Sequence, residues 1–458
     1  MPKQLRRSLG LTTGIAASCG IVVASTTLVD MGHGFGLAGM GFIIPMLIAM
    51  FLNLMVALSF GELSAMIPRA GAINHYTLPA MGSFMGIFAV ISGYIIVQIF
   101  AGSAEAAIPG LVIQQLFLPG IDPRVFSAII LLFLMAINIR GIDLFGWTQI
   151  ILTVIMIGSL IVVGFIGLTG TGTGTPVVTE LDPAITGWGL LGLTALAFWL
   201  FIGLEFVVPI AEEMRKPRIY VPLSMIIGLG IIFIAKAIFG SASVGYVPLD
   251  TLATSETPHL EAGFAILGRS GEIWLGIVTI AATMATLNTL ICGIPRMLFG
   301  MAQEGQAPST FAALNRWQTP WVGIIFSTLI ILVPNLLGIF TIEVIIIYIL
   351  AAVFSWFVCY IIAHLDVIIL RYKYPDVKRH FRSPLGILPQ IIGIIAMVYM
   401  MINIFPDPDM KRQIYLYALG FLGIAAIYSA LWVKLKMKQG LFETTPLEKL
   451  TDENYDEQ

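Results

Sequence analysis

Long apolar stretches, separated by short polar or charged clusters, follow one another along most of this chain. About 20 apolar helical residues cross the hydrocarbon core of a membrane, so stretches of this length predict membrane-spanning helices. We therefore expect an all-α integral membrane protein. Its twelve predicted spans are 13–31, 40–67, 84–109, 124–139, 146–168, 188–211, 221–246, 272–302, 321–340, 343–370, 385–405 and 413–435.

The same pattern divides the chain into a few parts. We expect an N-terminal tail at 1–12, ten spans within 13–370, a loop at 371–384, two spans within 385–436 and a C-terminal tail at 437–458. The acidic end of that tail, from Thr451, is predicted to be disordered. The first apolar stretch follows basic residues but ends in no small-residue cleavage site, so we interpret it as a retained span rather than a signal peptide.

Lysine and arginine residues gather on one side of the predicted bundle, which indicates the orientation. If the N-terminus is cytoplasmic, 19 of the 24 basic residues are inside, four are outside and Lys236 lies mid-span. This bias follows the positive-inside rule and predicts cytoplasmic termini in a cell inner (plasma) membrane. The inside set is Lys3, Arg6, Arg7, Arg69, Arg140, Arg215, Lys216, Arg218, Arg296, Arg316, Arg371, Lys373, Lys378, Arg379, Arg382, Lys434, Lys436, Lys438 and Lys449, and the outside set is Arg124, Arg269, Lys411 and Arg412.

Composition agrees with lipid as the solvent and excludes several classes of protein. Hydrophobic residues make up 58% of the 458 positions and charged residues 11%, and the mean hydropathy is +0.95. We find no polar stretch long enough for a soluble domain that could bind ATP. The glycine–threonine run 170–175 lacks the lysine of a phosphate-binding loop. The three cysteines lie within spans and the five histidines have no metal-ligand spacing, so we expect no disulfide, metal, cofactor, catalytic site or nucleic-acid partner.

Two predicted spans carry small residues near the middle of the membrane, where a helix can be interrupted. The first has a run of small and hydroxylated residues at 19–27, and the sixth has Gly203 followed by Glu205. Transporters with inverted repeats bind substrate where two corresponding helices are broken. Breaks that lie five spans apart indicate a five-plus-five repeat, although small residues can also serve helix packing.

Several motifs resemble the amino acid–polyamine–organocation permease family. Asn138-Ile139-Arg140-Gly141 is similar to its loop before the fifth span, and Phe198 to Glu205 is especially similar to the arginine/agmatine antiporter branch. The remaining motifs are Phe60 to Gly71 with Tyr76 and Gly82; Ala211-Glu212-Glu213 with Lys216-Pro217; Asn288, Arg296, Glu304-Gly305, Pro308 and Thr319-Pro320; and Leu370-Arg371, Pro375 and Phe381 to Pro384.

The resemblance implies a leucine-transporter-like fold, in which ten helices form two inverted repeats and two helices are added. Substrate would lie between the unwound centres of the first and sixth spans and reach either side by alternating access. This sequence departs from the family twice. It has Ala24-Ser25-Thr26 where members often carry Gly-Ser-Gly to bind a substrate carboxylate, and Met156 where several members carry a lysine in place of a sodium ion.

We therefore predict a substrate site at the two breaks. By the resemblance, Trp199 closes over the substrate, and its indole face also suits a cationic group. The site residues that we predict are Ala24, Ser25, Thr26, Glu105, Trp199, Ile202 and Gly203.

Charged residues inside the membrane are costly and are functional candidates. We assign coupling or gating to Asp30, Glu205 and Lys236. In the interpretation that we favour, Glu105 pairs with Lys236 while Glu205 exchanges a proton. In the alternative, a cationic amine on the substrate completes the charge balance.

The predicted function is secondary active transport of an amino acid or related amine, coupled to protons or working by exchange. The alternatives are a polyamine or organic-amine carrier without carboxylate recognition and a non-transporting membrane sensor. We expect no enzymatic activity, and the predicted partners are the small-molecule substrate, protons and membrane lipid.

The charge bias predicts which loops can be labelled from outside the cell. Single cysteines at Thr173, in the loop 169–187, and at Asp456 should show opposite accessibility to a membrane-impermeant reagent on intact cells. Labelling of both positions from the same side would contradict the twelve-span topology.

Overall fold

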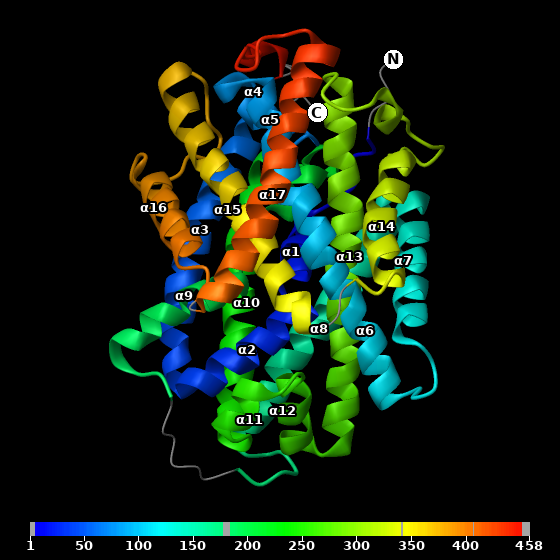
Figure 1. Cartoon of the computed structure of the whole chain (residues 1–458), viewed down its shortest axis with the longest axis vertical. Helices are drawn as coiled ribbons and strands as arrows, with labels where there is room; N and C mark the ends of the chain where they lie inside the picture. The colour runs from blue at the N-terminus through cyan, green and yellow to red at the C-terminus, as the bar shows by residue number, and fades with distance from the viewer. Residues whose placement is uncertain (1–4, 177–183, 340–341, 406, 451–458) are drawn as a thin grey trace.

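The protein is described by a computed structural model of residues 5–176, 184–339, 342–405 and 407–450. Within these residues the backbone is almost entirely helical (Figure 1), and an isolated bridge joins Leu9 to Met214. The helices that make up the spans are α1 (Leu11–Val22), α2 (Ser25–Ala38), α3 (Ile43–Met66), α5 (Ser83–Val90), α6 (Ser103–Leu116), α7 (Pro123–Arg140), α8 (Ile142–Thr169), α9 (Thr194–Trp199), α10 (Pro217–Tyr246), α13 (Arg269–Gln303), α14 (Trp321–Leu336), α15 (Ile342–Lys373), α16 (Leu388–Ile402) and α17 (Pro408–Leu431).

These helices confirm the twelve predicted spans. Nine helical segments of the described residues are long and apolar enough to cross a membrane, and three apolar helices, α1, α14 and α16, are shorter. The segment Ser25–Met66 joins the second half of the first span to the second span, so α1 completes the first span. Two π-helical turns connect α5 to α6 within the third span, and α9 continues into the 3₁₀ segment η5 (Leu204–Glu213) in the sixth.

The predicted boundaries differ from the structure mainly at the ends of the bundle. The first span continues to Ala38 instead of residue 31, and the last begins at Pro408 instead of 413. Three short helices lie outside the predicted spans: α4 (Ile73–Met81), α11 (Leu249–Thr254) and α12 (Pro258–Leu267). Their polar residues interrupt the apolar pattern, so hydropathy alone did not indicate them.

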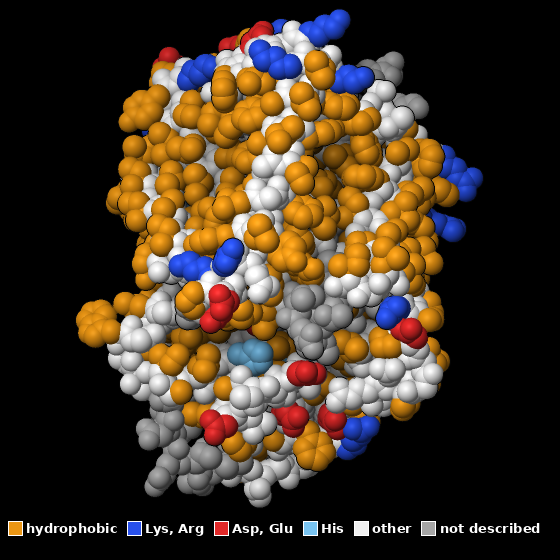
Figure 2. All heavy atoms as spheres, viewed as in Figure 1, with side chains coloured by type: hydrophobic (Ala, Val, Ile, Leu, Met, Phe, Trp, Pro, Cys, Tyr) orange, Lys and Arg blue, Asp and Glu red, His pale blue; other side chains and the backbone are white. Residues whose placement is uncertain are grey.

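A broad apolar surface surrounds the bundle (Figure 2). On α8, Trp147, Val154 and Phe165 expose 68%, 65% and 61% of their surface, values that are unfavourable in water and favourable in lipid. In the view of Figure 2, several Lys and Arg side chains gather at the upper end of this surface, and most of the visible Asp and Glu side chains lie in the lower part of the molecule. We call the upper end the terminal end, because the first and last described residues lie there (Figure 1).

Both tails pack onto the terminal end. The amides of Ser8 and Leu9 donate to the carbonyl of Glu213, each over 2.9 Å, and the carbonyl of Leu9 accepts from the amide of Arg215. Near the other terminus, Thr445 donates to the carbonyl of Leu78. The predicted tails at 1–12 and 437–458 are therefore partly structured, while the acidic end that we expected to be disordered, with Asp456, lies outside the described residues.

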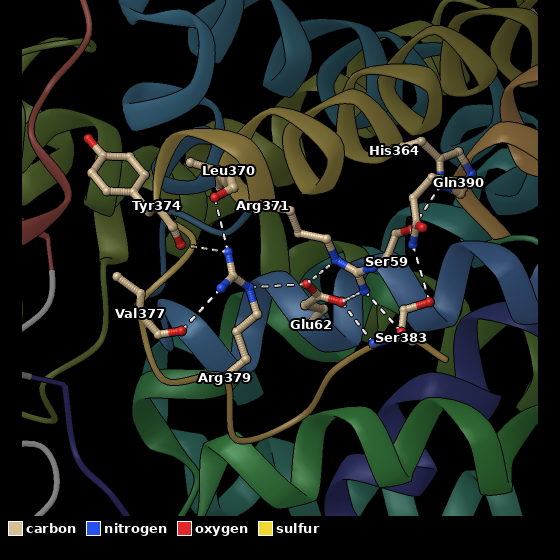
Figure 3. A network of polar contacts seen from close by, with 10 residues as sticks. All are labelled: Ser59, Glu62, His364, Leu370, Arg371, Tyr374, Val377, Arg379, Ser383 and Gln390. Carbon is tan, nitrogen blue, oxygen red and sulfur yellow. Dashed lines mark hydrogen bonds and ion pairs between the residues drawn. The ribbon is translucent and has the colours of Figure 1, made fainter. Parts of the chain in front are cut away.

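Glu62 organises one side of the terminal end (Figure 3). Its carboxylate, on α3, accepts from Nε and Nη2 of Arg371 on α15 at 2.8 and 2.5 Å, and lies 3.3 Å from Nε of Arg379. It also accepts from the amide of Ser383 at 2.8 Å. One buried carboxylate thus holds the second span, the tenth span and the loop 374–384 together.

A second buried ion pair joins the sixth and eighth spans at this end. Arg296 on α13 donates through Nε and Nη2 to the two carboxylate oxygens of Glu213, and through Nη1 to the carbonyl of Cys292 at 2.8 Å. The side chains of Glu213 and Arg296 are both almost fully buried.

This pair predicts a clear asymmetry in stability. Glu213→Gln should lower the free energy of unfolding by about 3–5 kcal/mol, because it leaves the Arg296 charge buried without a counter-ion. Removing both charges, in Glu213→Met with Arg296→Met, should recover much of the loss. Thermal unfolding of the purified protein in detergent measures both effects.

The control is Glu272→Gln, which removes the partner of the exposed Arg269. An ion pair near the surface contributes about 0–1 kcal/mol to stability, so the midpoint of thermal unfolding should change little. Equal effects of the two single substitutions would contradict the assignment of Glu213 and Arg296 as a buried pair.

Candidate functional site

The first and sixth spans are both broken near their centres, as predicted. Helix α1 ends at Val22 and α2 begins at Ser25, and Ala24 between them is extended, with φ −69° and ψ 156°. Helix α9 ends at Trp199 and η5 begins after Gly203, which has φ +107°. The sixth-span break therefore needs glycine. The first-span break does not, since any residue adopts the conformation of Ala24.

A cavity lies where the two breaks meet. Five of the predicted site residues line it: Ala24, Thr26, Glu105, Trp199 and Ile202. The other lining residues are Ile21, Thr27, Val97, Ala101, Gly102, Thr286, Leu290 and Trp356. Its wall is mostly apolar with a few polar groups, as small-molecule sites require.

The carboxylate of Glu105, on α6, caps the first turn of α2. Its Oε1 accepts from the amide of Ser25 at 2.7 Å and from the Ser25 hydroxyl at 2.7 Å, and its Oε2 accepts from the amide of Thr26 at 3.2 Å. Thr283 on α13 donates to Oε1 at 2.9 Å. The Glu105 carboxylate therefore accepts from four donors and lies at the positive, N-terminal end of α2.

Lys236, on α10, binds backbone carbonyls at the breaks, whereas Glu105 binds backbone amides. Its ammonium donates to the carbonyl of Leu200 at 2.8 Å, the hydroxyl of Thr27 at 2.8 Å and the carbonyl of Val22 at 3.3 Å. Val22 is the last residue of α1, and Leu200 directly follows the last residue of α9. The direct pairing of Glu105 with Lys236, which we favoured from the sequence, is not among these bonds. Glu105 binds donors at the first break, and Lys236 binds acceptors at both breaks.

Glu205 lies directly after the sixth-span break and is fully buried, but it does not line the cavity. Its carboxylate accepts from the indole N–H of Trp356 at 2.8 Å and the hydroxyl of Tyr360 at 2.6 Å, both on α15. The amide of Gly203 donates to the same hydroxyl at 3.2 Å. Trp356 separates the Glu205 carboxylate from the cavity. The side chains that bind Glu205 among the described residues are neutral donors.

Asp30 and Trp199 complete the set of predicted residues. Asp30 is half-buried on α2 and lies 3.9 Å from Nδ1 of His33, whose Nε2 is 2.9 Å from the carbonyl of Ser255. It is not among the cavity residues. Trp199 is 7% exposed, and its indole N–H has no hydrogen-bond partner among the described residues.

The structure adds residues that the sequence did not indicate, above all Trp356 and Tyr360 on α15, and Thr283 and Thr286 on α13. Trp356 and Tyr360 are four residues apart, so both point to one face of a helix. That spacing was a usable signal, because these aromatic side chains have polar tips that need partners when buried. The threonines carried no such signal, since threonine is common in membrane helices.

Among the described residues, no group of three or more His, Cys, Asp or Glu side chains is placed to hold a metal ion. Met156, at the position where several relatives carry a lysine, is fully buried on α8. The buried cation near the breaks is instead supplied by the seventh span, through Lys236.

Comparison with known proteins agrees with this architecture. The model of the amino acid permease family matches residues 4–426. The aromatic amino acid transport protein AroP of Escherichia coli K12 is 26% identical over 349 residues, which cover 72% of this chain and 73% of AroP. A D-serine/D-alanine/glycine transporter of Escherichia coli O6:H1 is 25% identical over 448 residues, covering 92% of this chain and 93% of that protein.

A solved structure shows the same fold. The crystal structure of a manganese transporter mutant from Eremococcus coleocola aligns with a TM-score of 0.59 and 13% identity, covering 95% of this chain and 98% of the other. The fold is thus leucine-transporter-like, with two inverted five-helix repeats and broken first and sixth helices. With the family model matched over nearly the whole chain, the protein is a transporter and not an enzyme, and it belongs to the amino acid permease family.

Proposed function

We propose that this protein carries an amino acid or a related amine across the cytoplasmic membrane by alternating access, coupled to protons or by exchange. The observation that supports this most is the cavity between the two helix breaks, with Trp199 and Trp356 in its wall. Broken helices in corresponding positions of two repeats form the substrate site of many secondary transporters. Residues 13–370 are then the transport core.

The proposed contacts with substrate come from Ala24, Ser25, Thr26, Glu105, Trp199, Ile202 and Gly203. Trp199 lies in the wall of the cavity with an unpaired indole N–H, as a side chain that closes over a substrate would. The names of the relatives, transporters of aromatic amino acids and of D-serine, D-alanine and glycine, support small zwitterions or their derivatives as substrates. The similarity of the sixth-span motif to the arginine/agmatine branch stays a prediction.

The terminal end is proposed to face the cytoplasm, because Lys and Arg side chains gather there (Figure 2) and the sequence predicts the same charge bias. Buried ion pairs close this end, with Glu213 and Arg296 on one side of the bundle and Glu62 with Arg371 on the other. For release to the cytoplasm, the segment η5 has to separate from α13 or move with it. Asp30, on α2 beyond the first-span break, is proposed to act at the outer entrance.

Transport itself is the first test. Purified protein in proteoliposomes should take up labelled amino acids or amines above the level of protein-free vesicles. Uptake should be trans-stimulated by unlabelled substrate if exchange occurs. Binding without any uptake or exchange would contradict the proposal and favour a membrane sensor on the same fold.

Gly203→Val should abolish substrate binding and leave folded protein in the membrane. The new side chain meets Ile21 at 3.2 Å and Trp356 at 3.4 Å from its Cβ, both in the cavity wall, at a φ of +107° that valine avoids. Ligand-induced thermal shift measures the binding. Gly158→Val on α8 is the control, because no described atom apart from the neighbouring residues of its own helix lies within 4 Å of its Cβ position. Unchanged affinity in Gly203→Val would place the site elsewhere.

Glu205→Gln should flatten the dependence of uptake on pH and keep substrate binding. Glu205 is a buried carboxylate, and the side chains that donate to it among the described residues, Trp356 and Tyr360, are neutral. A buried carboxylate without a counter-ion is stabilised by taking up a proton. Uptake rates are compared over the pH range in which wild-type uptake changes. Glu261→Gln, at an exposed position on α12, should keep the wild-type profile, and a profile that still changes in Glu205→Gln would remove the proton assignment.

A further inference from the structure

Two ion positions exist at the helix breaks, and side chains of the chain occupy both. In transporters with broken helices, the free amides of a half-helix bind an anionic group of the substrate, and the free carbonyls bind a cation. Here the amides of Ser25 and Thr26 bind Glu105, and the carbonyls of Val22 and Leu200 bind Lys236.

The anion position is fully used by Glu105. Both amides of the first turn of α2 donate to it, the Ser25 hydroxyl adds a third bond, and Thr283 holds the same oxygen from α13. A carboxylate tethered to α6 competes with any free carboxylate at a high effective concentration. A substrate carboxylate in the cavity would also lie beside a like charge in a medium of low dielectric.

The cation position is used in the same way. Lys236 is fully buried, and its three donors are directed at two carbonyls and the Thr27 hydroxyl. An ammonium has three donors, so none is left for a further partner. A sodium ion could bind these oxygens only by displacing the Lys236 ammonium.

The features left for a substrate favour a cation. Glu105 lines the cavity, and its Oε2 has one long hydrogen bond, of 3.2 Å, so it can accept another donor. The indoles of Trp199 and Trp356 lie in the same wall, and aromatic faces attract ammonium groups. The unpaired N–H of Trp199 suits a neutral oxygen such as a hydroxyl or an amide carbonyl.

We infer that the substrate is an organic amine without a carboxylate, bound through its ammonium group to Glu105 and transported without sodium. This inference rests on the proposed transport function and specifies its substrate class. It also explains why the first break has Ala24 and Thr26 beside Ser25, because only a side chain of the protein has to approach the backbone there.

Matched pairs of ligands test the substrate class on the unaltered protein. Binding to the protein in nanodiscs is measured for an amino acid and for the amine formed by its decarboxylation, over several pairs, in sodium chloride and in potassium chloride. We expect the amine to bind at least about tenfold more tightly than its amino acid in the pairs that bind, with the same affinity in both salts. Tighter binding of the amino acids, or binding that requires sodium, overturns the inference.

Variants of Glu105 test the mechanism. Glu105→Gln should weaken binding of the amine by at least about tenfold, because the charge partner is lost. Glu105→Ala frees the amides of Ser25 and Thr26, so it should gain binding of the matched amino acid. Glu256→Gln, at an exposed position beyond α11, is the control and should behave as wild type.

The outcomes separate this inference from the proposed function. If amino acids are transported and amines are not, the transport function stands and the amine assignment is wrong. If neither class binds or is transported, the proposed function fails and this inference fails with it. If the Glu105 variants do not fold, the comparison of matched ligands on the wild-type protein still decides the substrate class.

Discussion

A backbone amide or carbonyl in the hydrocarbon core of a membrane has no water to bind, so every interruption of a helix there needs a partner within the protein. This protein has two such interruptions, and three side chains serve them. Glu105 binds the amides after the first break, Lys236 binds carbonyls before both breaks, and Tyr360 binds the amide of Gly203. The cavity lies where these two unwound segments meet.

The segment η5 has a fully buried carboxylate near each end, Glu205 and Glu213, and these two are bound differently. Glu205 accepts from neutral donors of α15 beside the break, while Glu213 pairs with Arg296 of α13 at the terminal end. If η5 moves during transport, either α13 and α15 move with it or Glu205 and Glu213 exchange their partners. Breaking hydrogen bonds from neutral donors costs less free energy than breaking a buried ion pair, because no charged donor is left without its counter-ion. The end of η5 beside the cavity is therefore the more adaptable one.

Much of the candidate site could be predicted before its geometry was known. A run of small hydroxylated residues and a glycine five spans later indicated both breaks, and the cavity lies between them. Trp356 and Tyr360 were missed, because their four-residue spacing indicates a shared helix face but not which part of the bundle that face meets. We favoured the pairing of Glu105 with Lys236 because their opposite charges balance. A balance of charges does not show which backbone amides and carbonyls bind these two side chains.

The sequence by itself determined the number of spans, the all-helical class and the charge difference between the two ends, because these follow from local hydropathy and from the positions of Lys and Arg. Only the tertiary structure decided which groups meet at the breaks. Glu105 reaches Ser25 across 80 positions of the chain, and Lys236 reaches Val22 across 214. Contacts over such separations depend on how the helices pack and rotate against one another, and no local pattern in the chain encodes that arrangement.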